Sequence, residues 1–319
     1  MELRGSRPTF LIIGAQKAAS TALLNTLRSH PEIWMPEQED PFLRDPVFDI
    51  ARLPEFLASY ASHPEPIIGL KCPDYLGRAE VPQRIVDHLD RPKIILIVRN
   101  PVERAISGYF WQMRWGSLPI VHPDEGFPRL MRGEYLDINP RSAEVLDWGL
   151  YHKHIQDYLR LIPFQDLLVI HDKDFRSRRE EVLAEVLKFI GAEKPGGGLP
   201  VTRSSNEGVY PLPRLRFLQI RNRLILRWTP DRSYSTIFKP RNPLLRAYSN
   251  GVAAIDRWIL ARVYGNAKPS ISAEVIEQLR GYYEADATDF QRLIGKRLEG
   301  WPYREESLPN SSEDVPELR

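Results

Sequence analysis

The sequence predicts an α/β fold of three layers, a central parallel sheet flanked by helices. Short apolar runs alternate with helical segments from residue 8 to about residue 195, the pattern of a parallel sheet with covering helices. Two of these runs end at a strand-to-helix junction that carries a cation and hydroxyl side chains. With 319 residues, 42% of them hydrophobic, the chain is long enough to bury a large core.

The expected strands are short, largely β-branched runs bounded by turn residues. They are Phe10–Ile13, Ile67–Lys71, Ile94–Val98 and Leu167–Ile170. Apolar spacing predicts helices over Leu146–Leu161 and Arg179–Ile190. Gly191 follows the second helix, at the position where a C-cap glycine is expected.

The first junction follows the run that begins at Phe10 and has the order strand, Gly-x-x-Lys-x-x-Ser-Thr, helix. A helix N-terminus offers unpaired N–H groups and a positive dipole, so the turn suits a phosphate. A Walker A loop would place lysine directly before Ser/Thr, and this turn does not. The candidate phosphate ligands are Gly14, Gln16, Lys17, Ala18, Ala19, Ser20 and Thr21.

The second junction follows the run that ends at Val98 and reads Arg99-Asn-Pro-Val-Glu-Arg-Ala-Ile-Ser107. Asn100 is a good N-cap, and Pro101 fits the first helical position. Arg99 then lies at the carboxyl end of a strand, where open α/β sheets bind ligands. An arginine fork with the Ser107 hydroxyl suits a phosphate monoester. Arg104 lies one turn before Ser107 on the same helix face and is a candidate to assist it.

These two motifs, in this order, resemble the 5′-phosphosulfate loop and the 3′-phosphate motif of the sulfotransferases. That family uses 3′-phosphoadenosine 5′-phosphosulfate (PAPS) and releases 3′-phosphoadenosine 5′-phosphate (PAP). The closest branch is the heparan-type carbohydrate sulfotransferases with their bacterial relatives. The resemblance continues through Gly69–Leu76, Trp148–Tyr151 and the helix around Leu279 to Leu293. It implies a P-loop-like fold, with Arg99 and Ser107 on the 3′-phosphate.

The chain departs from the family at the first turn. The family usually has glycine near the positions of Ala18 and Ala19. Because alanine avoids the left-handed region, we expect this turn to avoid positive φ at both residues.

The resemblance also implies roles in an in-line sulfuryl transfer. Lys17 and the loop donors stabilise the leaving oxygens, Ser20 and Thr21 bind the 5′-phosphate, and Lys71 faces the reacting centre. The base is a glutamate after the first helix, in the segment Met35-Pro-Glu-Gln-Glu-Asp-Pro-Phe-Leu-Arg44. One register selects Glu39, another selects Asp40, and Glu37 is a third choice. The reaction is expected to need no metal ion, and the histidines show no metal-ligand spacing.

Composition excludes several classes of protein. The chain has 44 Lys+Arg against 42 Asp+Glu, so we expect no nucleic-acid partner. The single cysteine, Cys72, excludes an internal disulfide framework and fits a reducing compartment. No apolar run approaches a membrane span, and the N-terminus lacks a signal-peptide core. These observations predict a cytoplasmic protein.

The whole chain, 1–319, is expected to form one sulfotransferase domain with three segments: a nucleotide-binding core (8–195), a basic cover or substrate segment (196–250) and C-terminal helices (251–304). Within the second segment, residues 203–246 hold ten Arg/Lys and only two acids, Glu207 and Asp231. Three interpretations stay open for this stretch. They are a solvated helix face over the core, a cover over the cofactor or an acidic substrate, and peripheral contact with a membrane carrying a lipid acceptor.

The sequence therefore predicts a PAPS-dependent sulfotransferase acting on a hydroxyl of a glycan, glycolipid or small molecule. One alternative is a P-loop phosphotransferase using ATP, which the position of Lys17 disfavours. Another is a non-catalytic PAP-binding protein of the same fold. The aromatic residues Trp111, Trp115, Phe127 and Tyr135 are candidates to contact the acceptor, with core packing as the alternative.

Overall fold

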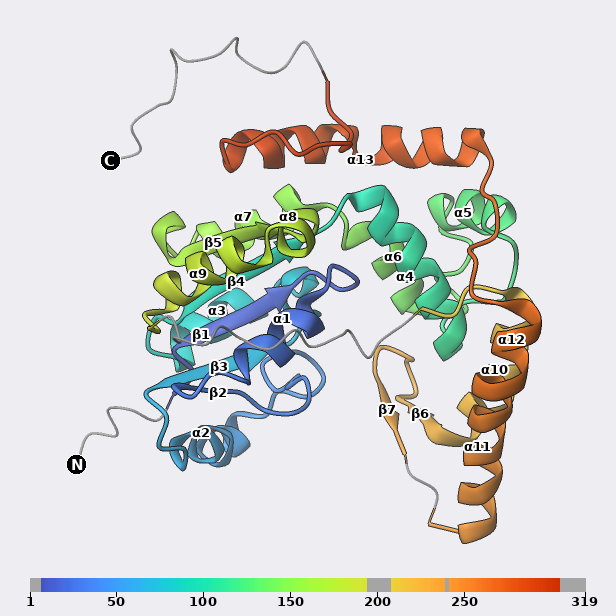
Figure 1. The fold of residues 1–319 in the computed structure, drawn as a ribbon, viewed down its shortest axis with the longest axis horizontal. Coiled ribbons are helices and arrows are strands. Elements are labelled where there is room, and N and C mark those ends of the chain that lie inside the picture. The colour runs from blue at the N-terminus through green and yellow to red at the C-terminus, as the bar shows by residue number, and fades with distance from the viewer. Residues whose placement is uncertain (1–6, 194–207, 239–240, 305–319) are drawn as a thin grey trace.

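The computed structural model describes residues 7–193, 208–238 and 241–304 (Figure 1). Its centre is a five-stranded sheet with the order β2-β3-β1-β4-β5, and every neighbouring pair is parallel. The strands are β1 (Phe10–Gly14), β2 (Ile33–Trp34), β3 (Ile67–Lys71), β4 (Lys93–Val98) and β5 (Leu167–His171). All four expected strands are present, and within this sheet the sequence analysis missed the two-residue edge strand β2.

The sheet is buried on both faces, which explains why its central strands are apolar at successive positions. Leu11 and Ile13 of β1 pack with residues of α3 (Val81–His88) and α7 (Tyr151–Leu159). The alternate residues Phe10 and Ile12 pack with α1 (Ser20–Leu27) and α9 (Arg179–Ile190). The structure therefore confirms the α/β, three-layer arrangement.

The order of the strands positions the functional site. β1 pairs with β3 on one side and with β4 on the other. Because all the strands are parallel, their carboxyl ends meet at one edge of the sheet. The chain builds one side of the sheet through β2 and β3, and the other through β4 and β5. The crevice beside β1 is thus a topological switch point, the place where such sheets bind ligands.

The prediction of one continuous helix over Leu146–Leu161 is wrong. The structure has α6 (Glu144–Asp147), a break, and then α7. At the break, a Cβ on Gly149 would lie 2.7 Å from a ring carbon of Tyr283. The Tyr283 hydroxyl also donates to the Leu146 carbonyl at 2.9 Å. Tyr283, which is distant in the sequence, therefore packs against the break between α6 and α7. By contrast, α9 and its Gly191 cap, at φ 83°, confirm the other prediction.

A third apolar cluster lies beyond the sheet, between α4 (Pro101–Trp115) and several C-terminal elements. The remaining helices are α2 (Leu53–Ala61), α5 (Pro123–Met131), α8 (Asp172–Ser177), α10 (Leu212–Ile225), α11 (Pro243–Ile255), α12 (Ala261–Tyr264) and α13 (Ala273–Leu293). Single turns of 3₁₀ helix occur at Ile50–Arg52, Tyr75–Gly77, Pro140–Ala143 and Phe164–Asp166, and a π-helical turn spans Asp256–Leu260. β6 (Leu226–Trp228) and β7 (Ser235–Ile237) form an antiparallel hairpin.

The basic stretch 203–246 enters this part of the fold. Its helix α10 buries Leu215 and Leu218 in the third cluster, as the helix-face interpretation expects. Arg203, Glu207 and Lys239 lie outside the described residues. The division into three segments stays a prediction. Among the helices of the described ranges, none combines the length and the apolar character needed to cross a bilayer.

Candidate active site

The turn between β1 and α1 is tight and takes two left-handed residues. Lys17 and Ala19 both have φ of 70°. The expectation that the alanine positions avoid positive φ is therefore wrong for Ala19. An alanine in this conformation costs roughly 1–2 kcal/mol relative to its usual regions, and the packing on both sides of the turn has to supply that energy. Ala18 is fully buried in the core below the turn.

The other residues of the turn are also fixed by their neighbours. A Cβ on Gly14 would lie 3.0 Å from Leu76 and 3.3 Å from Leu96, so a larger residue would press on two core side chains. The Gln16 amide donates to Asp74 at 3.5 Å. Ser20 is buried at the start of α1. The first turn of α1 therefore presents its unpaired N–H groups and its hydroxyls beside Lys17.

Lys17 is held in an electropositive environment. Its ammonium lies 4.4 Å from the centroid of the Trp111 ring. Burial, followed by the charges of Arg114 and Arg99, lowers the pKa of Lys17 from 10.5 to about 8, while Glu39 opposes the shift. An anion at this turn would therefore relieve a repulsion that already exists in the protein.

The carboxyl end of β3 carries an ion pair directed toward the same turn. Lys71 is 1% exposed, and its ammonium lies 2.5 Å from Oε1 of Glu39, which is 47% exposed. The same ammonium donates to the Thr21 hydroxyl at 3.0 Å. The structure therefore joins the end of β3, the first turn of α1 and the segment after β2 through one buried cation.

Asp40 has a different environment from its neighbour. Its carboxylate accepts from the Phe42 N–H at 3.0 Å and from the Tyr60 hydroxyl at 2.7 Å. Its backbone N–H donates to the Lys71 carbonyl at 3.0 Å. The Tyr75 hydroxyl donates to the Asp40 carbonyl at 2.7 Å. Asp40 thus fastens the loop to β3 and to two tyrosines.

Glu37, the third candidate base, lies away from this cluster. Its carboxylate is 3.5 Å from Arg28, and its side chain is largely exposed to solvent. The acidic segment therefore contains three carboxylates in three environments. Among them, the structure places Glu39 against the buried Lys71.

The β4–α4 junction forms as expected. Asn100 caps α4 by accepting from the N–H groups of Val102 and Glu103, and Pro101 opens the helix. Arg99 donates to Glu103 Oε2 from Nε at 3.0 Å and from Nη2 at 2.7 Å. The Tyr151 hydroxyl donates to the Arg99 carbonyl at 2.9 Å. The end of β4 is therefore fixed on both its backbone and its side chain.

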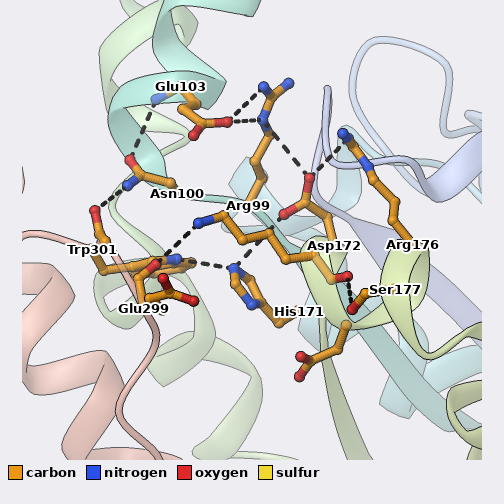
Figure 2. A network of polar contacts seen from close by, with 12 residues as sticks. Arg99, Asn100, Glu103, His171, Asp172, Arg176, Ser177, Glu299 and Trp301 are labelled. Atoms are coloured by element: carbon orange, nitrogen blue, oxygen red, sulfur yellow. Dashed lines mark hydrogen bonds and ion pairs between the residues drawn. The ribbon is translucent and has the colours of Figure 1, made fainter.

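Figure 2 shows that Arg99 lies between Glu103 and Asp172, with Arg176 on the far side of Asp172. Asp172 is 3.8 Å from Arg99 Nε and 2.9 Å from Arg176. Burial raises the pKa of Asp172, while Arg176 and Arg99 oppose that shift. Burial also works against the charge on Glu103, but the hydrogen bonds from Arg99 hold its pKa below the ordinary value.

His171 has a packing role beside this network. The Trp301 indole donates to its Nε2 at 3.2 Å, as Figure 2 shows. Burial lowers the pKa of His171. A cavity of about 490 Å³ opens next to it, between α8 and the segment after α13, and its lining includes Lys173, Arg176 and Lys296.

Ser107 and Arg104, which share one face of α4, have separate environments. Arg104 is fully buried and donates to the carbonyls of Glu144 and Val145. The suggestion that it assists a phosphate is therefore wrong, because the guanidinium points into the protein. Ser107 instead lines a small pocket together with Lys17 and Trp111.

The sequence analysis named Trp111 only as a candidate for acceptor contact, without placing it beside Lys17, and it missed Lys268. Trp111 is four residues after Ser107, so helical spacing could have placed its ring beside the site. Lys268 comes from the segment between α12 and α13, and no local pattern marks it. Burial lowers the pKa of Lys268, and Arg99 lowers it further. The charge of Lys268 therefore acts on the β4–α4 junction.

The aromatic candidates for acceptor contact are divided by the structure. Phe127 and Tyr135 are buried in the third cluster and belong to the core. For these two residues, the structure supports the core-packing alternative. Trp111 lies at the site, and the Trp115 ring lies 5.4 Å from it in an edge-on arrangement.

The donors gathered at this edge fit a nucleotide with phosphate groups at two positions. The β1–α1 turn offers Lys17 with helix N–H groups, and the adjacent junction offers Arg99 with Ser107. Strands β1 and β4 are direct neighbours, so a single ligand can span both junctions. Each cation lies beside a helix N-terminus, the arrangement that favours phosphate.

Comparison with known proteins agrees with this geometry. The family model described as "Sulfotransferase domain" matches residues 7–199, a range that contains both phosphate motifs. The chain belongs to the sulfotransferase family.

The chain is also similar to individual members. Heparan sulfate glucosamine 3-O-sulfotransferase 3B1 of Mus musculus is 28% identical over 306 residues, covering 92% of this chain and 65% of that protein. Heparan sulfate glucosamine 3-O-sulfotransferase 5 of the same species is 26% identical over 303 residues, covering 92% of this chain and 74% of that protein. The chain thus spans just under two thirds of the length of the first relative.

A solved structure shares the fold. The sulfotransferase from Alicyclobacillus acidocaldarius superposes with a TM-score of 0.61 at 18% identity. The match covers 92% of this chain and 98% of that one. At this identity, the likeness bears on the fold alone.

Proposed function

We propose that this protein transfers a sulfuryl group from PAPS to a hydroxyl group of a carbohydrate acceptor. The observation that carries the proposal is the contact of Glu39 with the buried ammonium of Lys71, which also reaches Thr21 in the first turn of α1. A carboxylate that is half exposed, yet fixed beside a phosphate-binding turn, can receive a proton from an incoming hydroxyl.

The proposed chemistry divides into three tasks. PAPS supplies the sulfuryl group, and PAP leaves with the electrons of the broken S–O bond. Lys17 and the N–H groups of α1 stabilise the charge that develops on the leaving phosphate oxygen. Glu39 accepts the proton of the acceptor hydroxyl as its oxygen bonds to sulfur. Lys71 holds the Glu39 carboxylate toward the turn and offers its charge to the reacting oxygens.

Glu39, rather than Asp40, is our assignment for the base. Both oxygens of the Asp40 carboxylate already accept hydrogen bonds, from Phe42 and Tyr60, and these bonds shape the loop. The Glu39 carboxylate instead contacts a cation at the site and keeps nearly half its surface accessible. We propose that Asp40 is a positioning residue, which holds the loop so that Glu39 meets Lys71.

The use of PAPS by this chain is part of the proposal. Arg99 and Ser107 have a use when the nucleotide carries a 3′-phosphate, and ATP has a free hydroxyl there. This difference disfavours the ATP-dependent phosphotransferase. The proposed mechanism assigns no step to a metal ion.

The class of acceptor is proposed from the relatives. Two of them are named for glucosamine residues of heparan sulfate, so we propose a glycan hydroxyl. The wider class of acceptors includes hydroxyl groups of glycolipids and small molecules. A cytoplasmic location stays a separate prediction, based on the single cysteine, which is buried.

The test is transfer of labelled sulfate from [³⁵S]PAPS to a panel of heparan-type glycans, glycolipids and small alcohols. The proposal expects label in at least one hydroxyl acceptor, with PAP formed in equal amount. If the protein binds PAP tightly but forms none with any acceptor, it is a non-catalytic PAP-binding protein. If the Glu39→Gln variant transfers label from PAPS as well as the unchanged protein does, the sulfotransferase proposal survives and the assignment of the base is wrong.

A further inference from the structure

The helices α11 and α12 carry an apolar stripe on the outside of the molecule. Its members are Leu244, Tyr248, Ile255, Ile259 and Val263, and each side chain is between 42% and 78% exposed. The steps between them are four, seven, four and four residues, so they follow one line along a helix. In Figure 1, α11 runs along the outer edge of the fold beside α10.

The π-helical turn at Asp256–Leu260 keeps this line straight. A π turn contains more residues than an α turn, and its i to i+5 bonding widens the helix locally. Steps of four residues drift around an α-helix, but they stay nearly in line where the helix widens. Ile255, Ile259 and Val263 therefore share a direction across the junction of the two helices.

The stripe is a second apolar face, because the first is already covered. Ser249, Val252 and Asp256 are buried on the neighbouring face of the same helical run. Asp256 receives two hydrogen bonds from Arg214 of α10, each 2.9 Å long. Arg214 also donates to the Gly265 carbonyl at 2.9 Å. This buried pair fixes the rotation of α11 and holds the stripe outward.

The charges beside the stripe are of one sign. Residues 241–264 contain four arginines, Arg241, Arg246, Arg257 and Arg262, and all four are exposed. The one acid in this range is Asp256, which is buried against Arg214. Exposed Trp258 and Tyr264 lie among the arginines, and the Arg262 guanidinium is 5.8 Å from the Trp258 ring.

We propose that the α11–α12 face docks in the plane of an anionic lipid membrane. Aliphatic side chains along one line, arginines around them and aromatic residues with polar edges are the features of a helix that lies in a bilayer interface. Arginine charges near an anionic surface add attraction that salt screens. A second copy of the chain fits less well, because a two-fold pairing would bring the arginines of both copies together.

The test uses the full chain and vesicles of two compositions, pure phosphatidylcholine and phosphatidylcholine with 30% phosphatidylserine. Co-sedimentation is expected at millimolar lipid with the anionic vesicles, at least tenfold stronger than with the neutral ones, and weaker in high salt. Absence of binding to the anionic vesicles overturns the proposal. Equal binding to both compositions overturns the role of charge.

Variants locate the surface. The triple change Ile255→Ser, Ile259→Ser and Val263→Ser should reduce vesicle binding at least tenfold, and so should the double change Arg257→Glu and Arg262→Glu. These side chains are exposed, so the circular dichroism spectrum and the melting temperature should be retained. Ile50→Ser with Val86→Ser, at exposed positions elsewhere, is the matched control and should bind as the unchanged protein does.

Light scattering distinguishes membrane docking from the competing possibility, that a second copy of the chain covers the stripe. The proposal expects a monomer in solution with or without the triple change. A dimer that the triple change dissociates would assign the stripe to a second copy and overturn membrane docking. Vesicle binding that the triple change leaves intact would place the docking surface elsewhere and also overturn it.

Discussion

The two strand-to-helix junctions of the site share an architecture and differ in electrostatic state. At the β1–α1 turn, the Lys17 ammonium lies over an aromatic ring near two arginines, and burial with those charges lowers its pKa to about 8. At the β4–α4 junction, Arg99 is already held by the carboxylates of Glu103 and Asp172. An anion that binds at the first junction relieves the repulsion among its positive charges. A phosphate that binds at the second junction must instead displace carboxylates that already contact Arg99.

The difference suggests a division of labour. The β1–α1 turn, with Glu39 and Lys71 beside it, holds its charges unbalanced where bonds would change. The β4–α4 junction holds a balanced network, which under the proposed function recognises one further phosphate. A change at the first junction should therefore act mainly on turnover, and a change at the second mainly on nucleotide affinity.

The largest effect is expected for Glu39→Gln. Loss of a well-placed base lowers turnover by about 10²–10⁴-fold, while PAP affinity should change little because the Glu39 carboxylate contacts Lys71 rather than Lys17 or Arg99. Steady-state kinetics and calorimetry on the same preparation measure the two quantities. Glu55→Gln, on the exposed surface of α2, is the matched control.

Asp40→Asn separates the two carboxylates. We expect this variant to lower the melting temperature, because it weakens the bond from Tyr60, and to lower turnover far less than Glu39→Gln does. If Asp40→Asn were as slow as Glu39→Gln while its melting temperature stayed unchanged, Asp40 rather than Glu39 would be assigned as the base.

The second effect is expected for Arg99→Ala. Loss of a charged fork from a phosphate weakens binding by roughly ten- to a hundredfold, and only PAP has the 3′-phosphate. Calorimetry should therefore show a large loss for PAP and a small one for adenosine 5′-phosphate. Equal losses for both nucleotides would remove Arg99 from the 3′-phosphate site.

The third effect is a pH dependence that belongs to Lys17. In the free protein its ammonium is charged below a pKa of about 8. A bound anion favours the charged form, so the pKa in the complex is higher, and binding above pH 8 takes up a proton. PAP affinity should therefore fall as pH rises, by roughly tenfold between pH 7.5 and 9.5. Calorimetry across this range measures the fall, and Lys17→Arg should flatten it.

A profile that stayed equally steep in Lys17→Arg would assign the titration to another group. The phosphates of PAP lose their last protons near pH 6, so they contribute little above pH 7.5.

The smallest effect is expected for Glu103→Gln. This change removes one of the two carboxylates that compete with phosphate for Arg99. A partly exposed ion pair contributes about 0.2–1 kcal/mol, so PAP affinity should rise by roughly 1.5- to fivefold. Glu125→Gln, which faces Arg129 with the same spacing on α5, is the control. Weaker PAP binding in Glu103→Gln would mean that Glu103 positions Arg99 rather than competing for it.

The sequence predicted what depends on local pattern. The parallel strands, the Asn100 cap, the Pro101 start and the Gly191 end follow from residues that are neighbours in the chain, and the structure has each of them. The family assignment rested on two junction motifs of the same local kind.

What the sequence could not predict depends on distant contacts. Tyr60, Tyr75 and Lys71 fold the loop that separates the roles of Glu39 and Asp40, and no spacing within the loop reveals them. The left-handed Ala19 and the break at Gly149 have the same origin, because packing overrides the local preference at both. Trp111 is the exception, since its helical spacing from Ser107 was visible.

The most direct test of the account is calorimetry of the unchanged protein with PAP, adenosine 5′-phosphate and magnesium ATP. The account predicts tight binding of PAP, binding of adenosine 5′-phosphate that is at least tenfold weaker, and little binding of magnesium ATP. Equal affinities for PAP and adenosine 5′-phosphate, or a preference for magnesium ATP, would contradict the claim that both junctions hold one nucleotide phosphorylated at two positions.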